Sequence, residues 1–172
     1  MQTSPNPVAP RALLVTFEHL AAIVGVGLAD QTRRELLSQG AVEAFTPPVI
    51  GDYWPGQGGV YAGQVREDDG TQYHVILADA KPAARLPWAA ALKWAKTVTV
   101  DGHADFEVPT RRASALLFAN LPHLFEKTWH WTSAPYAPNE SDAWICDFGG
   151  GLQGYGHKGY GTAARAVRRF VA

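Results

Sequence analysis

The chain has 172 residues, of which 47% are hydrophobic and 18% are charged. This size and composition are typical of one globular domain, alone or with a short appendage, and they exclude a chain that is disordered throughout. The formal net charge of −1 excludes a general electrostatic attraction to nucleic acid or to an anionic membrane. The single cysteine, Cys146, excludes an internal disulfide framework and a zinc site built from several cysteines.

The first 48 residues are predicted to form two segments. Residues 1–12 are rich in Pro, Ser and Asn, which favours an extended lead-in, and their prolines stand where a secretion signal needs a charged start and an apolar core. Residues 13–48 show a helical pattern in two pieces, in which Asp30 is a suitable N-cap and Gly40 a suitable stop. Glu18 and His19 interrupt the apolar stretch, so we expect a helical segment for attachment or oligomerisation and no membrane insertion.

Strand and helix signals alternate between residues 46 and 121. Pro and Gly punctuate "FTPPVIGDYWPGQGGVYAGQV", which favours turns and strands, and "TQYHVILAD" is the predicted partner strand after the "EDDG" turn. Amphipathic helices are predicted in "LPWAAALKWAKTV" and "PTRRASALLFANLP", with Thr110 as the N-cap of the second. The residues at helical spacing are Trp88, Leu92 and Ala95 in the first helix, and Ala115, Leu116 and Ala119 in the second.

The remaining chain is predicted to add strands in "TWHWTS", "AWICDF" and "ARAVRRF", which gives an α+β fold. Alternation puts Trp129 and Trp131 on one face of their strand and His130 on the other. Such an aromatic pair favours the core over ligand contact, and the same holds for Trp144. The arginines of the last strand, Arg165, Arg168 and Arg169, are expected to hold carboxylates or carbonyls more than a ligand.

Catalytic and metal-binding motifs are not evident in the sequence. It has no phosphate-binding loop with its lysine, no HExxH and no GxSxG. The six histidines are scattered, which leaves a metal site assembled in space as a minor alternative. "GHADFEVPTRR" brings Asp101, Asp105 and Glu107 together, but its spacing does not match an EF-hand, so a loop followed by a helix cap is favoured over a calcium site.

Five segments taken in order resemble a known family. They are "GDYWPGQGGVYAG", "WAAALKWAKTV", "GHADFEVPTRRASALLFANL", "WHWTS" and "AWICDFGGGLQGYGHKGYGTAARAVRRF". Together they resemble the bacterial and phage family called DUF1566, or the Lcl C-terminal domain, within the C-type-lectin-like superfamily that also includes the variable proteins of diversity-generating retroelements. The resemblance covers residues 49–170. It implies that residues 49–172 form a C-type-lectin-like, ligand-binding domain with two helices and short, mostly antiparallel strands.

The last segment of the resemblance divides into fixed and interposed positions. The fixed positions match Ala143, Trp144, Phe148, Gly151, Gln153, Lys158, Arg165, Ala166, Val167, Arg168 and Arg169. The resemblance implies that the interposed residues are displayed as a ligand-binding face: Ile145, Asp147, Gly149, Gly150, Leu152, Gly154, Tyr155, Gly156, His157, Gly159, Tyr160 and Thr162. Cys146 and Gly161 are interposed as well, and Tyr136 is a further candidate for aromatic contact.

The function implied by the resemblance is recognition without catalysis. The expected partner is a protein or glycan receptor on a cell surface, bound by a homo-oligomer or a multivalent display on a virion or a bacterial surface, with retroelement diversification as one origin of the variable face. No cofactor is expected, although some lectin-like folds use calcium. Two alternatives stay open: a structural virion or scaffold protein, and a metal-dependent oxidoreductase related to formylglycine-generating enzymes, which the single cysteine disfavours.

Overall fold

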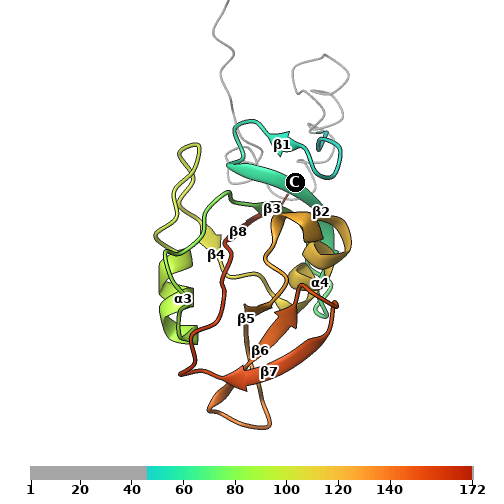
Figure 1. The fold of residues 1–172 in the computed structure, drawn as a ribbon. Helices are drawn as coiled ribbons and strands as arrows, with labels where there is room; N and C mark the ends of the chain where they lie inside the picture. Colours follow the sequence, from blue (N-terminus) through green and yellow to red (C-terminus); the bar gives the residue numbers. More distant parts are fainter. Residues whose placement is uncertain (1–45, 172) are drawn as a thin grey trace, which may run out of the picture. The chain divides into compact units, whose positions relative to one another are not determined.

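Two antiparallel sheets and two α-helices make up the part of the chain that the structure, a computed structural model, describes, residues 46–171 (Figure 1). The elements in chain order are β1 (Tyr53–Trp54), β2 (Gly59–Arg66), β3 (Gln72–Leu77), α3 (Trp88–Ala95), β4 (Phe106–Glu107), α4 (Arg111–Asn120), the 3-10 helix η1 (Pro122–Leu124), β5 (Trp129–Pro135), β6 (Asp142–Asp147), β7 (Gln153–His157) and β8 (Val167–Phe170). The predicted α+β class is confirmed. The predicted lead-in and residues 13–45 of the helical segment lie outside the described residues, while residues 46–48 are not helical.

The larger sheet has the strand order β1-β2-β3-β8-β4, and the smaller one the order β5-β6-β7. β8, the last strand of the described residues, pairs antiparallel with β3 from Leu77 opposite Val167 to His74 opposite Phe170. The first three strands and the last strand of the described chain therefore lie in one sheet. The β6–β7 hairpin lies in the other.

A β-bulge in β2 shows how local sequence fits the sheet to a helix. The register between β2 and β3 shifts between Tyr61 and Gly63, and Gly63 has a φ of +120°, which a residue with a side chain rarely adopts. The carbonyl of Ala62, left over by the bulge, accepts a hydrogen bond of 2.8 Å from the side chain of Asn120 at the end of α4. The bulge therefore links β2 to α4 without leaving a buried carbonyl unpaired.

The helix α4 packs between β2 and the strands β5 and β6 of the smaller sheet. Its N-terminus is capped as predicted, because Thr110 Oγ1 accepts a hydrogen bond of 3.1 Å from the backbone N–H of Ala113. The predicted apolar positions of this helix are confirmed only at Leu116, which is partly buried against the core. Ala115 and Ala119 are exposed, and the buried residues are Ala113, Ser114 and Leu117, because the large Leu117 is the side chain that reaches the core.

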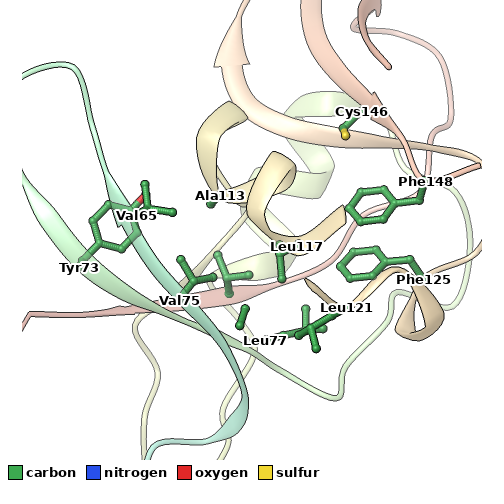
Figure 2. Close-up of a cluster of buried hydrophobic side chains, with 12 residues drawn as sticks. Val65, Tyr73, Val75, Leu77, Ala113, Leu117, Leu121, Phe125, Cys146 and Phe148 are labelled. Carbon is green, nitrogen blue, oxygen red and sulfur yellow. The ribbon is translucent and has the colours of Figure 1, made fainter. Parts of the chain in front are cut away.

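The main hydrophobic core joins both sheets through α4 (Figure 2). β3 contributes alternate residues, Tyr73, Val75 and Leu77, as its period of two requires. The stacked rings of Phe125 and Phe148, 3.8 Å apart, close the cluster beside the smaller sheet. A second cluster packs α3, whose buried Ala95 was predicted, against Trp131. These two clusters fix the smaller sheet from which the candidate site is built.

Candidate ligand-binding face

The segment with the predicted ligand contacts forms the β6–β7 hairpin and the chain after it. β6 and β7 pair antiparallel, with Cys146 opposite Gln153 at the turn end. The turn is closed by two backbone hydrogen bonds of 2.8 Å, from Asp147 N–H to the carbonyl of Leu152 and from Gly151 N–H to the carbonyl of Asp147. The glycine-rich run thus forms a defined turn that leads into an edge strand.

The turn needs a glycine at one particular position. Gly151 has a φ of +78°, and a Cβ added there would lie 2.3 Å from the ring of Phe118 on α4. Gly150, in contrast, would place a Cβ 3.3 Å from the carboxylate of Asp147. The carboxylate of Asp147 itself accepts a hydrogen bond of 2.9 Å from the N–H of Gly149. Asp147, predicted as a ligand contact, therefore already shapes the turn.

Alternation along β7 divides the predicted contacts between the two faces of the smaller sheet. The added Cβ atoms of Gly154 and Gly156 would meet Trp129 and Ile145, on the face that also carries the buried Trp131. Tyr155, between these glycines, points to the opposite face. The predicted residues are thus not one continuous face, because a strand shows every second residue to each side.

Aromatic rings gather on the Tyr155 side. Tyr155 stacks on Tyr136 with centroids 4.2 Å apart and planes 11° apart, and Tyr136 meets Trp144 edge to face at 5.1 Å. The guanidinium of Arg111 lies 3.4 Å from the centroid of Trp144, in cation–π contact. We call Arg111, Tyr136, Trp144, Gln153 and Tyr155 the aromatic face. Tyr155 is 56% exposed, whereas the other four are half-buried.

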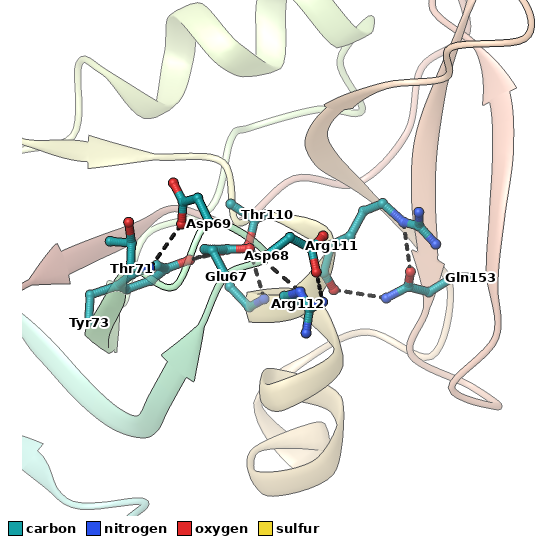
Figure 3. A network of polar contacts seen from close by, with 10 residues as sticks. Glu67, Asp68, Asp69, Thr71, Tyr73, Thr110, Arg111, Arg112 and Gln153 are labelled. Atoms are coloured by element: carbon teal, nitrogen blue, oxygen red, sulfur yellow. Dashed lines mark hydrogen bonds and ion pairs between the residues drawn. The ribbon is translucent and has the colours of Figure 1, made fainter.

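Two reciprocal hydrogen bonds fix the polar end of the aromatic face (Figure 3). Arg111 Nε donates to Gln153 Oε1 at 3.0 Å, and Gln153 Nε2 donates to the backbone carbonyl of Arg111 at 2.8 Å. Arg111 forms no salt bridge with any residue in the described range 46–171. A cation is therefore held in a set orientation, and its charge is not neutralised by a neighbouring carboxylate.

A cleft of about 480 Å³ adjoins the aromatic face at Arg111 and Gln153. Beside it, Glu67 accepts hydrogen bonds from Tyr73 Oη at 2.5 Å and Thr110 Oγ1 at 2.8 Å (Figure 3). Burial and the hydrogen bond to Glu67 raise the pKa of Tyr73 to about 12. The other residues lining the cleft are Glu67, Asp68, Thr110, Arg112, Ala115, Ser133 and Ala134.

The remaining predicted contacts lie at the end of β7 and in the chain that follows it. His157 and Tyr160 have ring centroids 5.3 Å apart, and the N–H of Gly159 donates to His157 Nδ1 at 3.1 Å. Tyr160 is 69% exposed, while the backbone of Thr162 is paired with Leu86. These residues form a second exposed cluster. Within residues 46–171, neither His157 nor Tyr160 makes a ring contact with Tyr136 or Trp144.

Several residues of the hairpin belong to the core or support it. Cys146, an interposed position, is fully buried, and burial raises the pKa of its thiol to about 11, so its expected display was wrong. Its side chain faces inward because α4 packs against this side of β6 and encloses Cys146 in the main core, on the face shared by its cross-strand partner His130. Trp131 is buried as predicted, but Trp129, expected in the same core, is 37% exposed and lies against Gly154. Leu152 is exposed in the turn.

The three arginines near the end of the chain hold protein groups, as predicted. Arg168 donates from Nε to both carboxylate oxygens of Asp105, at 2.8 and 2.9 Å, and Arg169 pairs with Glu107. Arg165 is buried and donates to two backbone carbonyls. The acidic loop that raised the question of calcium thus supplies carboxylates to β8.

Gln153 was predicted only as a fixed position, and the member of the aromatic face that sequence reasoning missed altogether is Arg111. It follows the capping residue Thr110 at the start of α4, where a charge usually points to water. Its role depends on the packing of α4 against β6, which places the helix start beside Trp144. The register of β6 and β7, with Trp144 opposite Tyr155, was a signal that could have joined these two residues.

Comparison of the chain with protein-family models and with curated proteins gives no match. Within residues 46–171, no group of three or more His, Cys, Asp or Glu side chains is arranged to hold a metal ion. In the same part of the chain, no helix has the length and apolar character needed to cross a membrane.

Proposed function

We propose that residues 49–172 form a recognition domain without catalytic activity, with a C-type-lectin-like fold, that binds a protein or glycan receptor on a cell surface through the aromatic face. The observation that carries the proposal is the exposed Tyr155, held in place by stacking on Tyr136, beside a cation over Trp144. Tyrosine, tryptophan and arginine are the side chains that contribute most often to binding hot spots.

The arrangement favours binding because little conformational freedom is left to lose. Stacking fixes the rings of Tyr136 and Tyr155, and the two hydrogen bonds with Gln153 fix Arg111. Ordering a flexible side chain at an interface costs roughly 0.5–1.5 kcal/mol, so side chains ordered beforehand keep more of their contact energy for the ligand. The adjoining cleft gives a ligand room to reach the guanidinium.

At several positions the division between fixed and displayed residues supports the family resemblance, although the fixed residues Trp144 and Gln153 belong to the aromatic face and the interposed Cys146 is buried. Ala143, Phe148 and Val167 at fixed positions are buried, and Gly151 is required by the turn. Gly149, Gly150, Leu152 and the chain from Tyr155 to Tyr160 reach the surface at many interposed positions. Diversification of such residues would change the ligand at little cost in stability, which fits a retroelement-variable protein displayed in several copies.

The experiment compares Tyr155→Ala and the double variant with Tyr136→Ala against the unaltered full chain. Labelled protein is applied to a glycan array and to intact bacterial cells, with protease-treated and periodate-treated cells as separate samples. We expect the double variant to lose about tenfold or more in apparent affinity for whichever probe binds, because it removes two stacked aromatic contacts. Sensitivity to protease or to periodate identifies the receptor as protein or glycan.

Tyr53→Ala is the matched control, because Tyr53 is an exposed tyrosine (47%) on β1 of the other sheet. It should bind as the unaltered chain does. A further variant, His157→Ala with Tyr160→Ala, tests the second exposed cluster. If the latter variant abolishes binding and the Tyr155–Tyr136 variant does not, the aromatic face is the wrong site. The proposal would also be overturned if binding were unchanged in Tyr155→Ala, in Tyr155→Ala with Tyr136→Ala, and in His157→Ala with Tyr160→Ala.

A further inference from the structure

A second cleft, which shares no lining residue with the aromatic face, has a volume of about 290 Å³. Its walls come from the chain before α3, from the chain before β8, and from the start of the smaller sheet. Half of the lining residues are alanine or proline, whose small side chains do not fill the cleft. The remaining lining side chains are charged or titratable: Lys81, Arg85, Glu126, His130 and Arg165.

Arg165 is the buried member of this group, with 4% of its surface exposed. Its Nη1 donates to the carbonyl of Leu124 at 2.5 Å, and its Nη2 donates to the carbonyl of Ala78 at 3.1 Å. A guanidinium has five N–H donors, so these two bonds leave donors to spare. Arg165 Nε is buried and has no hydrogen-bond acceptor within residues 46–171. A buried donor without an acceptor lowers the stability of the folded chain, so such a group in a folded protein calls for an explanation, such as a bound ligand that accepts its hydrogen bond.

No carboxylate within the described chain forms a salt bridge with Arg165. Burial lowers its pKa, and the carboxylates of Asp79 and Glu126 oppose that change from beyond salt-bridge distance. The guanidinium lies 4.9 Å from the centroid of the Phe125 ring, a cation–π contact that stabilises the positive charge without neutralising it. Buried charges in proteins are normally paired, and Arg165 is an exception.

The other charges at the cleft leave an excess of positive charge. Arg85 and Glu126 form an exposed pair at 2.8 Å, in which one charge balances the other. Lys81 forms no salt bridge with any described residue. His130 donates from Nδ1 to the carbonyl of Thr128 at 2.9 Å, and burial lowers its pKa to about 4, so the ring adds no charge at neutral pH. Lys81 and Arg165 are therefore the cations that a ligand could neutralise.

We propose that this cleft binds a small oxyanion, either a carboxylate or a phosphate or sulfate group, between Arg165, Lys81 and Arg85. The oxygen atoms of such a group can accept hydrogen bonds from the N–H groups of Arg165 that do not bond to the carbonyls of Leu124 and Ala78. Charge-assisted hydrogen bonds of this kind are about twice as strong as neutral ones. Glu126 limits the site, because its charge opposes that of the ligand as soon as Arg85 turns from it. A group that carries more negative charge than Lys81 and Arg165 can neutralise is therefore disfavoured.

The test titrates the full chain with acetate, sulfate and inorganic phosphate in separate experiments, with chloride keeping the ionic strength constant. Binding is followed by the NMR resonances of the His130 ring and by calorimetry. We expect saturable binding of at least one anion, together with a rise in the pKa of His130, because an anion beside the ring favours its protonated form. The three anions distinguish a carboxylate site from a phosphate or sulfate site.

Substitutions at the surface of the cleft avoid the danger of unfolding the protein at Arg165. Lys81→Ala should weaken binding roughly five- to tenfold, since it removes one charge from the site. Glu126→Gln should strengthen it, because the opposing carboxylate is lost. Lys93→Ala, an exposed lysine on α3 that does not line the cleft, is the matched control and should bind normally. Equal weakening by Lys81→Ala and Lys93→Ala, or no saturable binding of any of the three anions, would overturn the proposal.

Discussion

β6 and β7 are neighbours in one hairpin, yet they use their residues in opposite ways. β6 is the central strand of the smaller sheet and buries Asp142, Ala143 and Cys146, whereas β7 is its edge strand and buries none of its residues. A central strand has neighbours on both sides, and here the core of α4 covers one of its faces. The position of a strand in the sheet thus decides which residues can change, more than their place between fixed positions along the chain.

The largest expected loss of stability comes from a substitution on the buried side of the smaller sheet. Trp131, opposite Ile145 of β6, is 1% exposed, and its Nε1 donates to the carbonyl of Leu86 at 2.7 Å. Trp131→Ala should lower the free energy of unfolding by about 3–5 kcal/mol, because it opens a cavity and leaves that carbonyl without its donor. Unfolding by urea, followed by circular dichroism, measures the change.

Trp129→Ala is the matched control on the same strand. Trp129 is 37% exposed and lies against Gly154 of β7. Its loss should cost about 1 kcal/mol or less, because the ring is already partly in water and an edge strand can adjust. Equal losses for the two tryptophans would contradict the division between a buried and a displayed side.

The next effect depends on pH and concerns His130, opposite Cys146 of β6. Burial holds the pKa of His130 at about 4, below its ordinary value of 6.5. Between these values the unfolded chain binds the proton and the folded chain does not, so stability is complete above about pH 6.5 and falls as the pH approaches 4. The loss should reach roughly 3 kcal/mol, and His130→Phe should flatten this part of the stability profile.

The profile is measured by urea unfolding between pH 4 and 7 at constant ionic strength. His74 must be kept in every variant, because burial lowers its pKa as well and contributes with the same sign. His123→Gln, which replaces an exposed histidine, is the control substitution. If His130→Phe kept the slope of the unaltered chain, titration of His130 would not be the cause.

Much of the fold could be predicted because its signals are local. Thr110 caps α4 through its own side chain, and "EDDG" turns the chain between β2 and β3, so neither depends on distant residues. The arginines were expected to hold carboxylates or carbonyls, and the acidic residues Asp105 and Glu107 that Arg168 and Arg169 bind are among those noted in the sequence.

The errors share a different cause, which is packing between distant segments. The inward face of α4 and the burial of Cys146 follow from how α4 packs between the two sheets. The hydrophobic pattern within a single helix or strand does not determine that packing. Arg111 joins the aromatic face for the same reason. The division of the interposed residues between two faces was, in contrast, within reach, because a strand has a period of two once its bounds are known.

The smallest expected change in stability concerns two glycines, Gly150 and Gly151, in the turn between β6 and β7. Gly151→Ala should destabilise the chain by about 1–3 kcal/mol, because its φ of +78° is unfavourable for alanine and the new Cβ would collide with Phe118 unless that ring moves. Gly150→Ala meets only the Asp147 carboxylate and should change stability by about 0.5 kcal/mol or less. For a chain of this length, about 1 kcal/mol corresponds to roughly 2–4 °C in the midpoint of thermal unfolding, so both variants can be compared by calorimetry. If both substitutions left the stability unchanged, the whole turn would belong to the displayed surface. If only Gly151→Ala lowers the stability, the rigid scaffold extends through the turn to the first residue of β7.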